Sequence, residues 1–181
     1  MTNLHPSEVH YYGDLLYIED YDTFCHTNFG KEIQSAVRKQ LTNIICEFEF
    51  GFQDGGCLML ARAFKKWSGD NLDLYYIVNG KMPNIVQHVV ASYQGKVFID
   101  SDGLGTEKDF LKKSDLLEGI LEPQMHKVSS NTNLSGIIND EDYILEISTK
   151  LSSELGSFQS NLFEEVLHTN GSENHEIGHK I

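Results

Sequence analysis

A cysteine behind two glycines is the feature of this sequence best suited to chemistry. Cys57 follows Gly55 and Gly56 and opens a run whose apolar positions recur at helical spacing. A thiol in the first turn of a helix lies near unpaired backbone N–H groups and the positive end of the helix dipole, which favour the thiolate. The glycines allow a tight turn and keep bulk away from the sulfur. The pattern indicates a nucleophile; the alternative is a small core residue, because free cysteines are often buried.

Two side chains downstream of this cysteine could complete a set of nucleophile, base and orienting acid. His88 lies in an apolar, strand-like run, and Asp100 ends the next such run. A histidine can take the thiol proton on one ring nitrogen while the other nitrogen donates to a carboxylate. If Gln94-Gly95 is a strict two-residue loop, Asp100 points away from His88. An odd-length loop or a bulge brings either Asp100 or Asp102 beside the ring.

The remaining pattern predicts the elements that would position these side chains. Residues 1–30 lack a regular pattern, and residues 118–139 carry no clear signal. Elsewhere the apolar spacing, the Asn79-Gly80 turn and a capping box at Thr106 predict helices over 31–46, 57–67, 106–117 and 140–168, and strands over 72–79, 85–93 and 96–100. Gly156 is a candidate kink in the long last helix. This order favours an α+β fold in which the cysteine helix packs on a small antiparallel sheet.

This arrangement resembles the papain-like superfamily, especially its transglutaminase-like and arylamine N-acetyltransferase-like members. The matching residues are Cys57 at a helix start, His88 on a strand and Asp100 on the neighbouring strand, within residues 53–105. The resemblance implies a papain-like, transglutaminase-like fold and favours Asp100 as the orienting acid. It also implies that Gln53, ahead of the cysteine, donates to the oxyanion together with the cysteine's backbone N–H.

A rival motif lies near the end of the sequence. His175-Glu176-Ile177-Gly178-His179 matches H-E-x-x-H, in which two histidines on one helical face bind zinc and the glutamate acts as base. Zinc catalysis needs a third protein ligand, which such families place downstream, and the sequence given stops at Ile181. Residues 170–181 are polar and are expected to form a flexible tail after a single domain over residues 1–169. The motif is therefore kept as the second enzymatic alternative.

The charge and composition of the chain restrict the kinds of partner and the compartment that are expected. The net charge is −13, and acids exceed bases most strongly before residue 31 and after residue 128. Such a chain is a poor binder of nucleic-acid phosphates, although an acidic surface could bind a basic protein. No secretory signal or membrane-length apolar run is present in the sequence, and three cysteines cannot all pair, so a reducing cytoplasm is expected.

These observations predict a thiol hydrolase or acyltransferase that acts on an amide or ester of a protein, peptide or small acyl substrate. Cys57, His88 and Asp100 would form its triad, and no cofactor is needed. Whether water or an amine accepts the acyl group is left open. The non-enzymatic alternative is an acidic binding or inhibitor protein of the same fold with an inert cysteine.

Overall fold

The structure is a computed structural model that describes residues 9–12, 15–18, 27–45, 55–116 and 118–172. Within these residues it is an α+β protein with five helices and an antiparallel five-stranded sheet, beside a separate two-stranded hairpin. In chain order, the elements are β1 (Val9–Tyr12), β2 (Leu15–Ile18), α1 (Asn28–Ile45), α2 (Cys57–Trp67), β3 (Asp73–Asn79), β4 (Met82–Tyr93), β5 (Val97–Asp100), β6 (Gly103–Gly105), α3 (Glu107–Leu116), β7 (Gln124–Lys127), α4 (Glu141–Leu155) and α5 (Ser160–Ser172).

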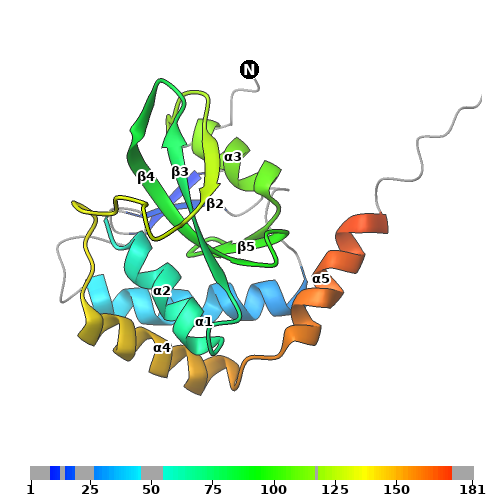
Figure 1. Cartoon of the computed structure of the whole chain (residues 1–181). Helices are drawn as coiled ribbons and strands as arrows, with labels where there is room; N and C mark the ends of the chain where they lie inside the picture. Colours follow the sequence, from blue (N-terminus) through cyan, green and yellow to red (C-terminus); the bar gives the residue numbers. More distant parts are fainter. Residues whose placement is uncertain (1–8, 13–14, 19–26, 46–54, 117, 173–181) are drawn as a thin grey trace, which may run out of the picture.

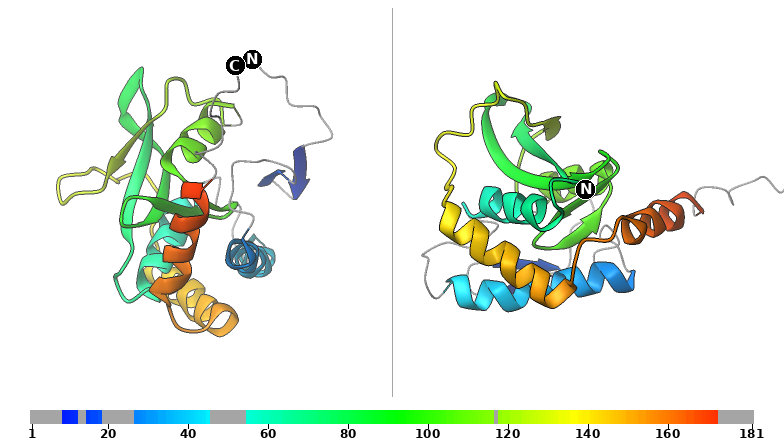
Figure 2. Two further views of the ribbon diagram at one scale, coloured as in Figure 1. Left: turned by 90° about the vertical axis from the view of Figure 1, so that its right-hand side faces the viewer. Right: turned by 60° about the horizontal axis from the view of Figure 1, so that its bottom comes forward.

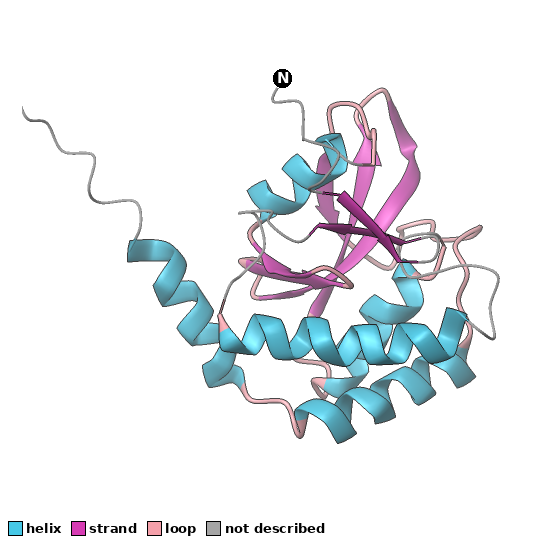
Figure 3. Ribbon diagram, turned by 180° about the vertical axis from the view of Figure 1, so that it is seen from behind, coloured by secondary structure: helices cyan, strands magenta, loops and turns pink. Residues whose placement is uncertain are grey.

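The large sheet has the strand order β6-β5-β4-β3-β7, and its strands carry helices on both faces. Helix α2 lies between the sheet and α4, and α1 and α4 run side by side below it, while α3 lies against the other face (Figures 1 and 3). The turned views in Figure 2 separate these layers. None of the helices in the described part of the chain is both long and apolar enough to cross a membrane.

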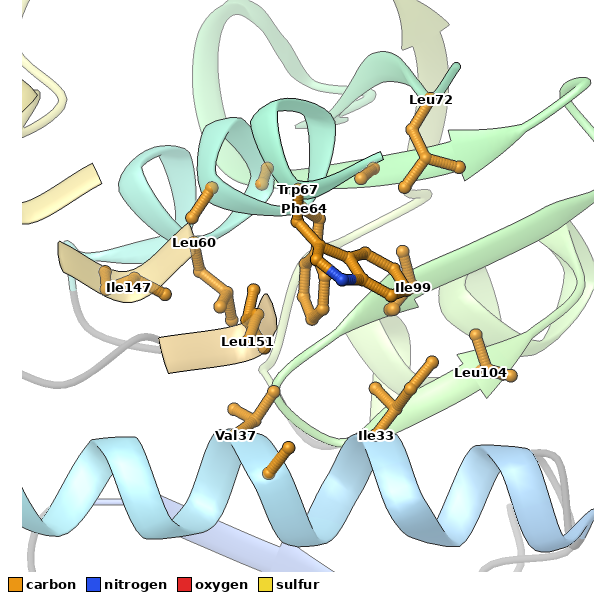
Figure 4. Packing of buried hydrophobic residues seen from close by; sticks show 14 of the residues in the cluster. Ile33, Val37, Leu60, Phe64, Trp67, Leu72, Ile99, Leu104, Ile147 and Leu151 are labelled. Carbon is orange, nitrogen blue, oxygen red and sulfur yellow. The ribbon is translucent and has the colours of Figure 1, made fainter. Parts of the chain in front are cut away.

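The larger core fills the space between the sheet and helices α1, α2 and α4 (Figure 4). Helix α2 supplies much of it, because its apolar residues recur every three or four positions and nearly all of them are buried. A smaller core on the opposite face joins α3 to the sheet through Ile77, Val90, Phe98, Phe110 and Ile120. The sheet therefore separates two apolar layers.

Several expected elements are confirmed with small changes of boundary. The cysteine helix, the three central strands and α3 lie where the apolar spacing placed them, and β3 and β4 form the hairpin expected at Asn79-Gly80. Strand β4 begins earlier than expected, at Met82. Residues 1–30 were expected to be irregular, but they contain β1, β2 and the start of α1. Strands β6 and β7 were not predicted, because neither has an alternating apolar pattern.

The expected long helix over 140–168 is wrong: the structure has two helices, α4 and α5, separated at Gly156. Gly156 has a φ of 74°, a left-handed value that ends a helix and that glycine adopts without strain. Its carbonyl oxygen accepts a 2.8 Å hydrogen bond from Trp67 Nε1. Helix α5 also continues through Asn170 and Gly171 to Ser172, beyond the expected domain boundary at residue 169. The rest of the expected tail, residues 173–181, lies outside the described residues.

Candidate active site

Cys57 occupies the first position of α2, as its sequence context indicates. Gly56 is the residue before the helix, and its carbonyl oxygen accepts the N–H of Leu60, so the helical hydrogen bonds begin at once. The Cys57 side chain is 5% exposed and belongs to the larger core. This burial is what the core-residue alternative expects, but the polar surroundings of the sulfur are not those of an inert core thiol.

The sulfur of Cys57 accepts hydrogen bonds from the His88 side chain and from the backbone N–H groups of Val89 and Leu58. Burial alone would raise the pKa of the thiol, because it disfavours the charged form. The hydrogen bond and positive charge of His88, with the two backbone donors, outweigh burial and lower the pKa of Cys57 below its ordinary value. These contacts stabilise a thiolate at the start of the helix.

His88 lies in β4 beside a β-bulge. It pairs with Ile77 of β3, whereas the next pair joins Val78 to Val86, so Gln87 is the extra residue. A bulge re-aims the neighbouring side chain, and the buried His88 ring contacts both Cys57 and Asp100. Burial lowers the pKa of His88, but the hydrogen bonds to Asp100 and Cys57, with the charge of Glu118, raise it to about 10. The ring is therefore held as an imidazolium.

Asp100 ends β5, and a three-residue loop places it on the His88 side of the sheet. Tyr93 pairs with Val97, so residues 94–96 form an odd-length connection. Continuing this register puts Asp100 opposite Val90, two residues from His88 and on the same face. This is the odd-length case left open by the sequence, and the loop is not the strict two-residue turn.

The Asp100 carboxylate is surrounded by donors. Its Oδ2 atom lies 3.1 Å from His88 Nε2 and 2.6 Å from Lys113 Nζ, and its Oδ1 atom accepts the backbone N–H of Asp102 at 2.7 Å. Burial raises the pKa of the carboxyl, but the positive charge of Lys113 and the hydrogen bond from His88 hold it well below its usual range. Asp100 is therefore an anion that fixes the orientation of the His88 ring.

Lys113 is the part of this site that the sequence did not reveal. It lies in α3, its side chain is 3% exposed, and its Nζ atom lies 2.6 Å from Asp102 Oδ2 as well as from Asp100. Glu118 Oε1 is 3.6 Å from the same nitrogen. Burial lowers the pKa of Lys113, but the charges of Asp100 and Asp102 raise it, so the ammonium persists. Its only signal in the sequence is its position three residues after Phe110, on the apolar side of the helix.

Asp102, the alternative orienting acid, has a different environment from Asp100. Its carboxylate binds Lys113, and burial and the neighbouring charge of Asp100 raise its pKa, while Lys113 lowers it. The two aspartates thus share one ammonium, but their pKa values are displaced in opposite directions. Of the two, Asp100 is the carboxylate that holds a hydrogen bond to the His88 ring.

Four elements build the site: β4 and β5 of the sheet, and helices α2 and α3 on its two faces. Helix α2 brings Cys57 from the larger core, and α3 brings Lys113 from the smaller one, where its ammonium lies 5.6 Å from the Phe110 ring centroid. The start of α3 is held by the expected capping box, in which Thr106 N–H donates to Asp109 Oδ2 at 2.8 Å. The β4–β5 pairs run from Tyr93–Val97 to Ala91–Ile99, and the buried polar groups meet beyond that last pair.

Other predicted site residues lie elsewhere or cannot be placed. Gly56 supports the helix start, as described above. Gln53, the expected oxyanion donor, and the H-E-x-x-H residues His175, Glu176 and His179 all lie outside the described residues. Within the described part of the chain, no group of three or more His, Cys, Asp or Glu side chains is arranged to hold a metal ion.

The arrangement supplies the parts of nucleophilic catalysis in their working order. A thiol whose pKa is lowered contacts a ring whose pKa is raised, and that ring is fixed by a buried carboxylate. Comparisons with family models, with curated proteins and with solved structures found no match to this chain.

Proposed function

We propose that this protein is a thiol hydrolase or acyltransferase of the papain-like, transglutaminase-like kind, acting on an amide or ester bond. The observation that carries the proposal is the buried His88 ring, which contacts the Cys57 side chain and lies 3.1 Å from Asp100 Oδ2. An inert core cysteine has no need of a protonated base beside it, whereas a nucleophile does.

The proposed reaction has two halves. In the first, the Cys57 thiolate attacks the substrate carbonyl carbon, a sulfur–carbon bond forms, and the carbon–nitrogen or carbon–oxygen bond to the leaving group breaks. His88 gives its proton to the leaving group, which departs as an amine or alcohol. In the second, water or an amine attacks the thioester, His88 takes a proton from it, and the thiolate is released. The backbone N–H of Cys57 is the proposed oxyanion donor.

Asp100 has a supporting role in both halves. Its carboxylate fixes the ring orientation and stabilises the imidazolium while the proton is held there. We propose a protein, peptide or small acyl compound as substrate, and a reducing compartment such as the cytoplasm as the place of action, because the thiolate must stay free to react. No nucleic acid or membrane is part of this proposal. A basic surface on a protein substrate would suit the net charge of −13.

An activated ester tests the proposal without knowledge of the natural substrate. Purified protein is mixed with p-nitrophenyl acetate; nitrophenolate release is followed by absorbance, and the acetylated peptide is identified by mass. We expect acetylation of Cys57 in the wild type and in His126→Ala, a matched control that removes an exposed histidine of β7. Cys57→Ser and His88→Ala should each abolish it.

The double variant Cys57→Ser/His88→Ala should be little worse than either single variant. Groups that serve one proton-transfer step lose their joint contribution once, so their effects are not additive. Wild-type acetylation rates in folded Cys57→Ser would overturn the nucleophile assignment and would favour a binding protein. Equal losses in His88→Ala and His126→Ala would remove His88 as the base.

A further inference from the structure

The buried Lys113 ammonium lies between two carboxylates, and the proposed triad does not account for it. It is 2.6 Å from Asp100 Oδ2 and 2.6 Å from Asp102 Oδ2, so these two oxygens lie at most about 5 Å apart by the triangle inequality. At that separation, the buried Asp100 carboxylate and the half-buried Asp102 carboxylate repel strongly unless a cation lies between them. Lys113 supplies that cation.

We infer that Lys113 is a positioning residue which, by binding Asp100 and Asp102 together, keeps a full negative charge on the carboxylate that orients His88. This inference rests on the proposed function for its catalytic consequence. Its first consequence concerns only the ionisation of the cysteine, which can be measured without a substrate.

Without Lys113, the Asp100 and Asp102 carboxylates would lie close together with no cation between them. Two acids that share a site largely shielded from solvent cannot both ionise easily, so the pair takes up one proton and shares the remaining charge. Asp100 would then be a carboxylate for only part of the time. The imidazolium of His88 would lose some of its stabilisation, and the thiolate of Cys57 would lose stabilisation with it.

Other charged groups around the cluster are consistent with this role. Glu118, after α3, lies 3.6 Å from Lys113 Nζ, and it adds negative charge that the ammonium must also balance. His88 from β4 binds the same Oδ2 atom of Asp100 at 3.1 Å, a longer contact than the 2.6 Å of Lys113. Cys57 from α2 completes the set through the ring. Each group that takes a negative charge in this set therefore has a positive partner beside it: His88 beside Cys57, and Lys113 beside Asp100.

The test is the pH dependence of Cys57 alkylation by iodoacetamide between pH 5 and pH 9, read by mass at the Cys57 peptide. Lys113→Met removes the ammonium, and we expect the midpoint of the alkylation profile to move up by about one pH unit, which is about a tenfold loss of thiolate at pH values below the midpoint. Lys108→Met is the matched control, because it removes an exposed lysine from the same helix. Its profile should match that of the wild type.

A second-site variant separates positioning from simple packing. In Lys113→Met/Asp102→Asn, the carboxylate that shares the ammonium most closely with Asp100 is removed, so the alkylation profile should return towards that of the wild type. The double variant also removes opposite charges together, so it is expected to fold even if Lys113→Met alone does not, since a lost partner strands a buried charge. A purely packing role predicts no such rescue.

The outcomes are distinct from those of the proposed function. An unchanged profile in folded Lys113→Met, or a double variant still displaced by a pKa unit, would overturn the inference even if Cys57 is acetylated as proposed. A displaced profile that Asp102→Asn restores would support the inference, even if Cys57→Ser retained esterase activity and the nucleophile assignment failed.

Discussion

Removing the Cys57 sulfur should make the stability of this protein depend on pH where the wild type shows little dependence. His88 has a folded pKa of about 10 against 6.5 when unfolded. Its contribution to stability is therefore fully present below about pH 6.5 and is lost as the pH rises through 10. The pKa of Cys57 is lowered from 9.0, so its contribution is present above about pH 9 and is lost as the pH falls through the folded pKa.

Between these limits the two contributions oppose each other in the wild type, because the histidine contribution falls as the pH rises while the cysteine contribution grows. When the folded thiol is ionised, the folded pair holds one proton, on the ring, and the unfolded pair also holds one, on the thiol, so folding then neither takes up nor releases a proton. In Cys57→Ala, only the histidine remains, and its ring is still bound to Asp100 at 3.1 Å. The folded protein then holds one proton more than the unfolded chain over this range.

The magnitude follows from that single proton. The free energy of unfolding of Cys57→Ala should fall by about 1.4 kcal/mol for each pH unit between pH 7 and pH 9, which is up to about 3 kcal/mol in total. The contribution of Cys57 to the His88 pKa is lost in this variant, so a fall of about 1 kcal/mol is the lower expectation. The wild type should vary less than Cys57→Ala, because the ionisation of Cys57 opposes that of His88.

Urea denaturation at pH 7, 8 and 9 provides the measurement, with fluorescence of Trp67, the single tryptophan, as the signal. Every other titrating group is common to both proteins, so the difference between their two curves isolates the site. The double variant Cys57→Ala/His88→Ala is the control, and its slope should match that of the wild type. A flat curve for Cys57→Ala would refute the reasoning, because His88 would then not be held protonated by Asp100.

Two further outcomes are expected. Limiting iodoacetamide at pH 6 should label Cys57 faster than Cys25 or Cys46, because the pKa of its thiol is lowered by His88. Peptide mapping measures the labelling of each cysteine. Equal labelling of Cys25 and Cys57 would count against the thiolate. Asp100→Asn should slow acetylation of Cys57 by p-nitrophenyl acetate by about 10²–10⁴-fold while the fold survives, because the nucleophile and base remain. Asp102→Asn should cost less in the same assay, and a larger effect there would give the orienting role to Asp102.

Local signals in the sequence were enough to predict α2, which carries the proposed nucleophile, and α3. The apolar spacing after Cys57 predicted α2, because a helix that buries one face must repeat its apolar residues every three or four positions. The capping box at Thr106 predicted the start of α3, and the structure forms it with Asp109. Both signals act within one turn of a helix, so no distant contact is needed to interpret them.

The side of the sheet that Asp100 faces could not be decided in this way. Gln94 and Gly95 have φ values of 55° and 68°, and Lys96 N–H donates to the Tyr93 carbonyl, as in a two-residue hairpin turn. The strand pairs nevertheless begin at Tyr93–Val97, which leaves Lys96 outside the register. The same dipeptide fits both registers, and packing of the two cores against the sheet selects one. A shift of one residue would turn Asp100 away from His88.

The helix break at Gly156 also could not be predicted from the local sequence. One glycine inside a helical pattern costs only about 1 kcal/mol, so the pattern alone allows the helix to continue. In the fold, the indole of Trp67 lies where it can donate to the Gly156 carbonyl, and that carbonyl is free for it only if the helix ends there. The partner is 89 residues away in the sequence, which no local pattern reveals.

Lys113 shows that this site includes a residue that the cysteine, histidine and aspartate motif does not contain. A lysine on a helix is expected to lie in solvent, because an isolated buried ammonium costs several kcal/mol. Here that cost is offset by the carboxylates of Asp100 and Asp102, at the end of β5. Each of these carboxylates is in turn balanced by the Lys113 ammonium or by His88. Because none of these charges can be buried without a partner, the buried cysteine, histidine and aspartate are stable only together with Lys113 and Asp102. A substitution in α3 should therefore change the ionisation of a thiol at the start of α2, although the two helices lie on opposite faces of the sheet.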